Sequence, residues 1–336
     1  MPSELRRLPF LLLLVLLLAP AWASAGEVLD ATGRHVTLPA TIVRVMPAGP
    51  PAAVLLAALA PDMMTGWPHP PGPAAAALLA APLAALPKVP PLDKTALAAI
   101  EATHPDLIVD YGTISPRYLA RAQEAGFGAP VLLFDGALDQ APDVLRRLGA
   151  ALGRAARGEE LARMADAILS ARRPDAARRV IYARGEPDAL IAAAPGSQPY
   201  ETLRAAGWQV LAPTSEEGGK FRPVTAAVIA KLDPDVLILA DPASRAALAK
   251  APEWQAVRAV REGHAYIAPT LPFGWFEEPP SINRLLGLLW TEHYADPTAL
   301  AARAASLQAE LYGRAPGAAD TAALRDALAP IHAATP

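Results

Sequence analysis

Short apolar runs alternate along the chain with longer stretches in which apolar residues recur at every third or fourth position. The short runs predict buried strands, and the three-to-four spacing predicts amphipathic helices. Strands that alternate with helices in this way are typical of an α/β fold with largely parallel sheets. The predicted strands cover 42–46, 63–65, 107–109, 131–134, 180–182, 189–192, 210–211, 236–239 and 265–267.

The longest helical pattern lies between 140 and 173. A single helix of roughly 34 residues would be about 50 Å long, which is too long for a crossover inside one small domain. We therefore predict a strut that joins two lobes, with a possible break near Gly158. The predicted units are an N-terminal lobe (26–139), the inter-lobe helix (140–173) and a C-terminal lobe (174–336). The apolar stripe of the helix is formed by Leu145, Leu148, Leu152, Leu161, Met164 and Ile168.

A short pattern occurs on both sides of this helix. Pro105-Asp106 precedes one predicted buried strand and Pro234-Asp235 precedes another, and each residue of the second copy lies 129 positions after its counterpart. Each copy predicts a helix, a Pro-Asp turn and a strand. The repeat favours duplication of a lobe, although Pro-Asp before a strand is also ordinary turn chemistry.

Composition narrows the classes of protein. Of the 336 residues, 53% are hydrophobic and 19% are charged, so the chain can bury a sizeable core. The net charge of −3 argues against a nucleic-acid binder that relies on a basic surface. The chain has no cysteine, which excludes disulfides, cysteine nucleophiles, thiolate zinc sites and a cysteine-anchored lipoprotein.

Residues 1–25 have the pattern of a secretory signal peptide. Arg6 and Arg7 precede an apolar run over 10–18, and small residues at 23–25 form a cleavage signature. The apolar run of about nine residues is shorter than the roughly 20 needed to span a bilayer. We expect export to the periplasm and cleavage before Gly26, and an uncleaved anchor is the alternative.

Four further segments resemble one family of receptors. They are 30–39, 254–266, 272–275 and 280–290, in which Pro280-Ser281-Ile282-Asn283-Arg284 opens a helix. Together with the repeat, they are similar to periplasmic substrate-binding proteins of the helical-backbone class, which serve ABC importers of iron chelates, haem and cobalamin. The resemblance implies two Rossmann-like α/β lobes joined by one long rigid helix, with the ligand in the cleft between them. It also implies a monomer that docks on an ABC permease dimer in the inner membrane. We expect no cofactor, no catalytic residues and no resident metal site, and the sequence leaves open whether protein atoms ligate the iron of a bound complex.

In the first lobe, three side chains follow predicted strands, where α/β sheets hold ligands. Trp67 and His69 lie in a proline-rich loop, and Tyr111 directly follows the strand at 107–109. A tyrosine there could stack on a ligand or ligate ferric iron. Each of the three has an ordinary alternative, because the aromatic residues could be packed in the core and the histidine could be solvated.

In the second lobe, the candidate contacts are Ser197, Tyr200, Arg222 and Trp275. Ser197 and Tyr200 open a predicted helix whose backbone N–H groups could receive an anion. Arg222 lies in a predicted flexible loop and could bind a carboxylate or a catecholate oxygen pair. Trp275 belongs to the densest aromatic cluster of the chain and could form a wall of the cleft.

These residues predict a receptor for an iron complex, either a ferric siderophore or haem. A cobalamin or free metal-ion receptor of the same fold is the alternative. An exported hydrolase is less favoured because the chain has no Gly-x-Ser-x-Gly, His-Glu-x-x-His or P-loop motif. The positions where related receptors carry permease-docking glutamates hold Ala98 and Ala227, so Glu101, Glu201 or Glu216 would have to serve.

Overall fold

A computed structural model describes residues 26–90, 92, 94–112, 128–171, 178–186, 188–214, 219–244, 248 and 252–331. The predicted signal peptide lies outside these residues. The α/β class with largely parallel sheets is confirmed. The strands are β1 Glu27–Leu29, β2 His35–Thr37, β3 Val45–Pro47, β4 Leu107–Gly112, β5 Val131–Asp135, β6 Arg179–Arg184, β7 Ile191–Ala193, β8 Gln209–Val210, β9 Phe221–Pro223, β10 Val236–Leu239 and β11 Ala265–Ile267.

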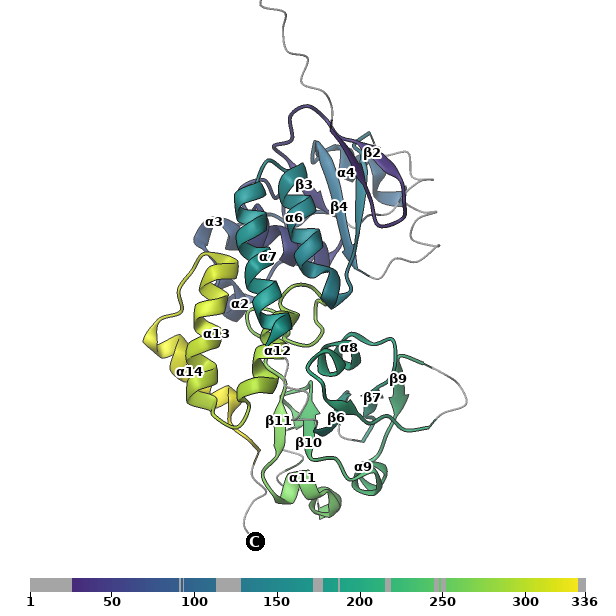
Figure 1. The fold of residues 1–336 in the computed structure, drawn as a ribbon, viewed down its shortest axis with the longest axis vertical. Helices are drawn as coiled ribbons and strands as arrows, with labels where there is room; N and C mark the ends of the chain where they lie inside the picture. The colour runs from purple at the N-terminus through teal and green to yellow at the C-terminus, as the bar shows by residue number, and fades with distance from the viewer. Residues whose placement is uncertain are drawn as a thin grey trace, which may run out of the picture.

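Helices surround both main sheets (Figure 1). The α-helices are α1 Pro50–Leu59, α2 Pro73–Ala76, α3 Ala81–Ala84, α4 Leu97–Glu101, α6 Ala141–Ala151, α7 Ala155–Ser170, α8 Gln198–Ala205, α9 Ala226–Leu232, α11 Arg258–Arg261, α12 Arg284–His293, α13 Pro297–Tyr312 and α14 Ala318–Leu328. The short 3₁₀ helices are η1 Lys94–Ala96, η2 Leu138–Gln140 and η4 Pro252–Ala256. No helix in the described ranges combines the length and apolar character that a membrane span requires.

Two sheets at opposite ends of the molecule define two lobes (Figure 1). In the described residues, the first lobe has a parallel three-stranded sheet in the order β3-β4-β5. The second has six strands in the order β11-β10-β6-β7-β9, with β8 paired to β6. The β11, β10, β6 and β8 strands are parallel, whereas β7 and β9 add an antiparallel edge. The strand at 221–223 was not predicted from the sequence, which indicated a flexible loop there.

The prediction of one helix over 140–173 is wrong. The segment forms two helices, α6 and α7, that pack side by side and are separated by Leu152–Arg154. Gly153 has a positive φ of 66°, which suits glycine at a tight helix-to-helix turn. A Cβ on Gly149 would lie 2.9 Å from the Cα of Gly158, so the two glycines let the helices approach closely. The 16 residues of α7 span about 24 Å and run from the first lobe toward α12 (Figure 1).

The repeated Pro-Asp pattern forms the same local structure twice. His104 and Asp233, which precede the two prolines, have positive φ values of 46° and 47°. Asp106 Oδ2 accepts a hydrogen bond from the Arg44 N–H at 2.8 Å, and Asp235 Oδ2 accepts one from the Arg179 N–H at 2.9 Å. In both lobes, therefore, the aspartate ties the start of its own strand to the neighbouring parallel strand.

The C-terminal helices connect the lobes. α12 packs against α7 and α8, and α13 packs against both α12 and α1. α1 is almost entirely buried, because the residues from Ala52 to Leu59 all lie in the core. A helix that is apolar all round needs cover on every side, and α13 supplies part of that cover. The chain after the second sheet therefore returns to stabilise the first lobe.

Candidate functional site

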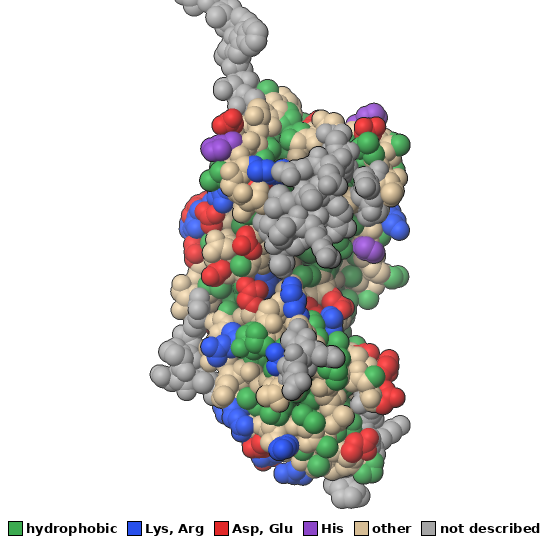
Figure 2. Space-filling view, turned by 90° about the vertical axis from the view of Figure 1, so that its right-hand side faces the viewer, with side chains coloured by type: hydrophobic (Ala, Val, Ile, Leu, Met, Phe, Trp, Pro, Cys, Tyr) green, Lys and Arg blue, Asp and Glu red, His purple; other side chains and the backbone are tan. Residues whose placement is uncertain are grey.

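The two lobes meet around η2 and the start of α8. A pocket of about 600 Å³ opens there. Its walls are Ala137–Asp139 of the first lobe and, from the second, Gly196, Ser197, Gln198, Tyr200, Glu201, Arg204 and Ala205. Figure 2 shows that acidic and basic side chains gather at the level where the lobes meet. The pocket is therefore polar and is shared by both lobes.

A buried arginine links the lobes beside this pocket. The Arg284 side chain is fully buried, and its Nη1 donates to Glu201 Oε2 at 2.6 Å. Its Nη2 donates to the backbone carbonyl of Gly136 in the first lobe. Glu201 Oε1 in turn accepts a hydrogen bond from the Leu138 N–H at 2.6 Å. The carboxylate and the guanidinium thus form a continuous polar chain from one lobe to the other.

The first turn of α8 lies at the pocket. Ser197 is the residue before the helix, and its hydroxyl donates to the Ala194 carbonyl at 2.8 Å and does not cap the helix. Pro199 has no N–H and the Glu201 N–H donates to the Ser197 carbonyl at 3.0 Å, so the first-turn N–H groups without a partner in the helix are those of Gln198 and Tyr200. These two are available to an anionic group. Arg204 lines the same pocket from the last turn of α8 and is exposed. The negative charge of Glu201 is already compensated by Arg284.

Two of the seven residues predicted from the sequence line this pocket. Ser197 is 1% exposed, and Tyr200 is half-buried. Both come from α8 or the residue before it, as the predicted helix start indicated.

The two tryptophans lie in the core and do not line this pocket. Trp67 is 2% exposed, and its Nε1 donates to the Leu83 carbonyl at 2.9 Å. Trp275 is 0% exposed, and its Nε1 donates to the Leu271 carbonyl at 3.1 Å. The ring of Trp67 packs against Phe273 with 5.7 Å between centroids. Their roles as ligand contacts stay predictions.

Tyr111 lies next to Arg284 at the end of β4. The residue is 1% exposed, and burial raises the pKa of its phenol to about 12, although the Arg284 charge acts in the opposite direction. The phenol is close to the guanidinium, but its hydroxyl forms no hydrogen bond of ordinary geometry with the described residues. Tyr111 is therefore behind the pocket, on the path that connects the lobes.

The remaining two predicted residues lie elsewhere. Arg222 is half-buried on β9, and its Nη1 donates to the Pro213 carbonyl at 2.8 Å. Its buried Nε has no hydrogen-bond partner among the described residues. His69 is exposed in the loop before α2. Neither residue lines the pocket between the lobes.

A second buried ionic cluster lies at the end of β6. Glu277 is 6% exposed and accepts hydrogen bonds from Tyr182 Oη and Arg184 Nη1, both at 2.9 Å. Burial raises the pKa of Glu277, although Arg184 and Tyr182 act against that shift. The guanidinium of Arg184 lies over the ring of Phe221 at 3.8 Å. In the described part of the chain, no group of three acidic or histidine side chains is arranged to hold a metal ion.

Sequence reasoning missed Arg284 and assigned Glu201 elsewhere. From the sequence, Arg284 was named only as part of the segment 280–290 that resembles the family, and Glu201 only as a candidate for docking. A charged residue beside an apolar stripe was the one signal that could have indicated a buried ion pair.

Comparisons with known proteins identify what the chain resembles. The family model described as "Periplasmic binding protein" matches residues 56–270. An ABC transporter solute-binding protein from Sulfurospirillum deleyianum has a TM-score of 0.76 at 22% identity, covering 89% of this chain and 98% of that one. No curated protein sequence gives a significant match.

Two further solved structures have named ligands. The molybdate-binding periplasmic protein of Haemophilus influenzae has a TM-score of 0.64 at 16% identity, covering 87% of this chain and 99% of that one. The periplasmic catecholate-siderophore binding protein of Vibrio cholerae has a TM-score of 0.58 at 16% identity, covering 73% and 91%. At these identities the likeness concerns the fold.

Proposed function

The chain belongs to the periplasmic binding protein family, and we propose that it captures an anionic iron complex, either a ferric siderophore or haem, for an ABC importer of the inner membrane. Members of this family are solute receptors that work with ABC permeases, and they are not enzymes. The observation that carries the proposal is the pocket shared by η2 and α8.

The size and charge of this pocket support an anionic chelate. Its volume of about 600 Å³ falls within the range of about 300–1,000 Å³ that is usual for small-molecule sites. The first turn of α8 and the Arg204 guanidinium both favour negative charge. Ferric catecholates and the propionates of haem carry such charge. Tyr200 adds an aromatic surface at the same place.

A small oxyanion is a second candidate, and a different observation favours it. Arg284 is a fully buried cation, and the adjacent Tyr111 hydroxyl has no hydrogen-bond partner among the described residues. A tetrahedral oxyanion could accept hydrogen bonds from both groups if the lobes separate slightly. The similar protein of Haemophilus influenzae was solved with molybdate bound.

Isothermal titration calorimetry on the protein from Gly26 onward tests both candidates. We expect hemin or a ferric tris-catecholate to bind with a stoichiometry of one, and Arg204→Ala to weaken that binding about tenfold, as expected for loss of a charge-assisted contact. The matched control is Arg163→Ala, because Arg163 is a 71% exposed arginine on α7 that does not line the pocket.

The two candidates give different outcomes. Sodium molybdate could bind the wild type and Arg204→Ala equally well and bind Tyr111→Phe more weakly. That result would favour a small oxyanion over an iron chelate as the ligand. Failure of hemin, the ferric catecholate and molybdate to bind would contradict both candidates.

Delivery to an importer requires export, and we propose that residues 1–25 direct it. The arginines at 6 and 7, the apolar run and the small residues at 23–25 support this proposal. Mass spectrometry of the protein from a periplasmic fraction should give an N-terminus at or near Gly26. Recovery of the uncleaved chain in the membrane fraction would contradict it.

A further inference from the structure

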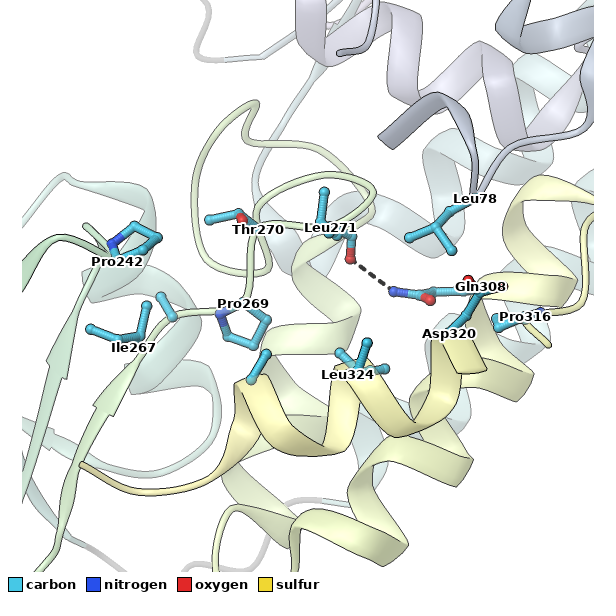
Figure 3. Close-up of a pocket in the computed structure, with 13 residues that line it drawn as sticks. Leu78, Pro242, Ile267, Pro269, Thr270, Leu271, Gln308, Pro316, Asp320 and Leu324 are labelled. Atoms are coloured by element: carbon cyan, nitrogen blue, oxygen red, sulfur yellow. Dashed lines mark hydrogen bonds between the residues drawn. The ribbon is translucent and has the colours of Figure 1, made fainter. Parts of the chain in front are cut away.

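A second pocket lies beneath α14, away from η2 and α8. Its volume is about 280 Å³, and its walls include Leu78 of the first lobe, Leu271, Gln308 on α13, and Ala323 and Leu324 on α14. Figure 3 shows these side chains around an open space between α14 and the segment that follows β11. None of these residues lines the pocket between η2 and α8.

The position of this pocket is typical of a ligand site. Pro242 follows β10, and the segment from Ile267 to Leu271 continues from β11. These are the carboxyl ends of two adjacent parallel strands, where open α/β sheets bind ligands. The helices α13 and α14 close the opposite side (Figure 3). Leu271 remains 39% exposed, which is unusual for a large apolar side chain in this protein.

The lining determines the charge of a suitable ligand. Most of the lining side chains are leucine, isoleucine, alanine or proline. The single titratable lining residue is Asp320, whose Oδ2 accepts a hydrogen bond from the Gly317 N–H at 2.9 Å and lies 3.4 Å from Arg314 Nη2. Because this carboxylate already has partners, the pocket offers no free charge to an ion. A neutral ligand fits the lining best.

One polar atom faces this apolar space without a partner. Gln308 is 3% exposed, and its Nε2 donates to the Leu271 carbonyl at 2.9 Å. Figure 3 shows this amide bridging the top of the pocket, with Leu324 beneath it. No hydrogen bond from another described residue reaches Gln308 Oε1. Gln308 lines the pocket, so its Oε1 is open to that space as an acceptor, and a ligand that brings an N–H or O–H group would gain a hydrogen bond there.

We propose that this pocket binds a neutral small molecule that has an apolar body and one hydrogen-bond donor, which it gives to Gln308 Oε1. The volume is at the lower end of the range for small-molecule sites, so the ligand is smaller than a siderophore or haem. This site does not depend on the proposed iron-complex receptor, because the two pockets share no residue.

Fluorescence titration with N-phenyl-1-naphthylamine tests the proposal. In this neutral probe one N–H joins a phenyl and a naphthyl group, and its fluorescence intensity increases in apolar surroundings. We expect saturable binding with a stoichiometry of one. Ala323→Trp fills the pocket and should weaken binding at least tenfold. The matched control is Ala318→Trp, because Ala318 is exposed on the same helix and does not line the pocket.

A second pair of measurements tests the hydrogen bond. The wild type should bind N-phenyl-1-naphthylamine about tenfold more tightly than 1-phenylnaphthalene, which lacks the N–H, and Gln308→Met should abolish that difference. Absence of saturable binding, or equal binding by the wild type and Ala323→Trp, would overturn the site. An equal preference in the wild type and Gln308→Met would overturn the role of Gln308. Thermal unfolding of each variant shows whether it is folded.

Discussion

Arg284 and Glu201 form an ion pair in which the guanidinium is fully buried, with 2.6 Å between Nη1 and Oε2. The pair joins α12 to α8 inside the second lobe. The same two side chains also bond the backbone of Gly136 and Leu138 in the first lobe. A single pair of charges therefore holds three segments in register at the place where the lobes meet.

Glu201→Gln should destabilise the protein, because it leaves the buried Arg284 cation without an anion. Loss of one partner from a buried pair costs about 3–5 kcal/mol, and the 38% exposure of Glu201 reduces the expected cost to about 2 kcal/mol. Urea unfolding measures the change. The control is Glu159→Gln, which removes a half-exposed partner of Arg146 and should cost much less.

A double variant separates the charge from the packing. In the Arg284→Met background, Glu201→Gln should have little further effect, because the cation is gone. If Glu201→Gln lowered the free energy of unfolding equally in the wild type and in Arg284→Met, the ion pair would contribute nothing to stability.

The parallel strands could be predicted because their signal is local. β4 and β10 each begin with an apolar run that follows a Pro-Asp turn, and the structure places each of them between two parallel neighbours. The prediction of a single helix over 140–173 was wrong because the spacing of apolar residues continues through the turn at Gly153. Two helices that bury the same face keep that spacing, so periodicity alone does not reveal the break.

The candidate site could be predicted only in part. Ser197 and Tyr200 were found because a helix start after a strand is visible in the sequence. Trp67 was predicted as a contact because it lies in a proline-rich loop, and Trp275 because it belongs to the densest aromatic cluster, but both side chains lie in the core and away from this pocket. The partnership of Arg284 with Glu201 joins residues 83 positions apart. Only tertiary structure brings such residues together.

Gly158→Ala should destabilise the protein although alanine favours helices by about 1 kcal/mol. A Cβ at this position would lie 2.5 Å from the Leu145 carbonyl oxygen, so α6 and α7 would have to move apart. We expect a loss of about 2 kcal/mol in urea unfolding, the magnitude usual for overpacking. Ala156→Leu, an exposed enlargement on the same helix, should be nearly neutral. A stabilised Gly158→Ala would contradict the close helix contact.

Tyr111→Phe should leave the stability at pH 7 within about 1 kcal/mol of the wild type, because the buried hydroxyl makes no hydrogen bond with the described residues. At alkaline pH the variant should become the more stable protein. The pKa of Tyr111 rises from 10.0 to about 12 on folding, so the unfolded wild type loses its proton first and is favoured as the pH rises above 10. Urea midpoints at pH 8 and pH 11 test this, and an unchanged difference between the two proteins would contradict it.

Asp30 should make the stability of the protein depend on acid pH. Burial alone would raise the pKa of this carboxyl, but hydrogen bonds from Thr32 and Arg34 outweigh it and lower the pKa below 3.8. The shortest of these bonds join the carboxylate to Thr32 Oγ1 and Arg34 Nη2, both at 2.6 Å. Because Arg34 also donates to the Val131 carbonyl at 3.1 Å, Asp30 fixes the β1–β2 hairpin to the edge of the first sheet.

The sign of this dependence follows from the depressed pKa. The stabilisation by Asp30 is fully present well above pH 3.8 and is lost as the pH falls through the lower folded value. Asp30→Asn should therefore cost about 2 kcal/mol at pH 7 and progressively less as the pH falls through the lowered pKa of Asp30, because the wild type then loses the same interaction. The control, Asp143→Asn, removes a 57% exposed partner of Arg147 and should show a small cost with little change across this range. If the difference in unfolding free energy between the wild type and Asp30→Asn did not narrow as the pH falls below 3.8, the charge of Asp30 would not be what holds the hairpin in place.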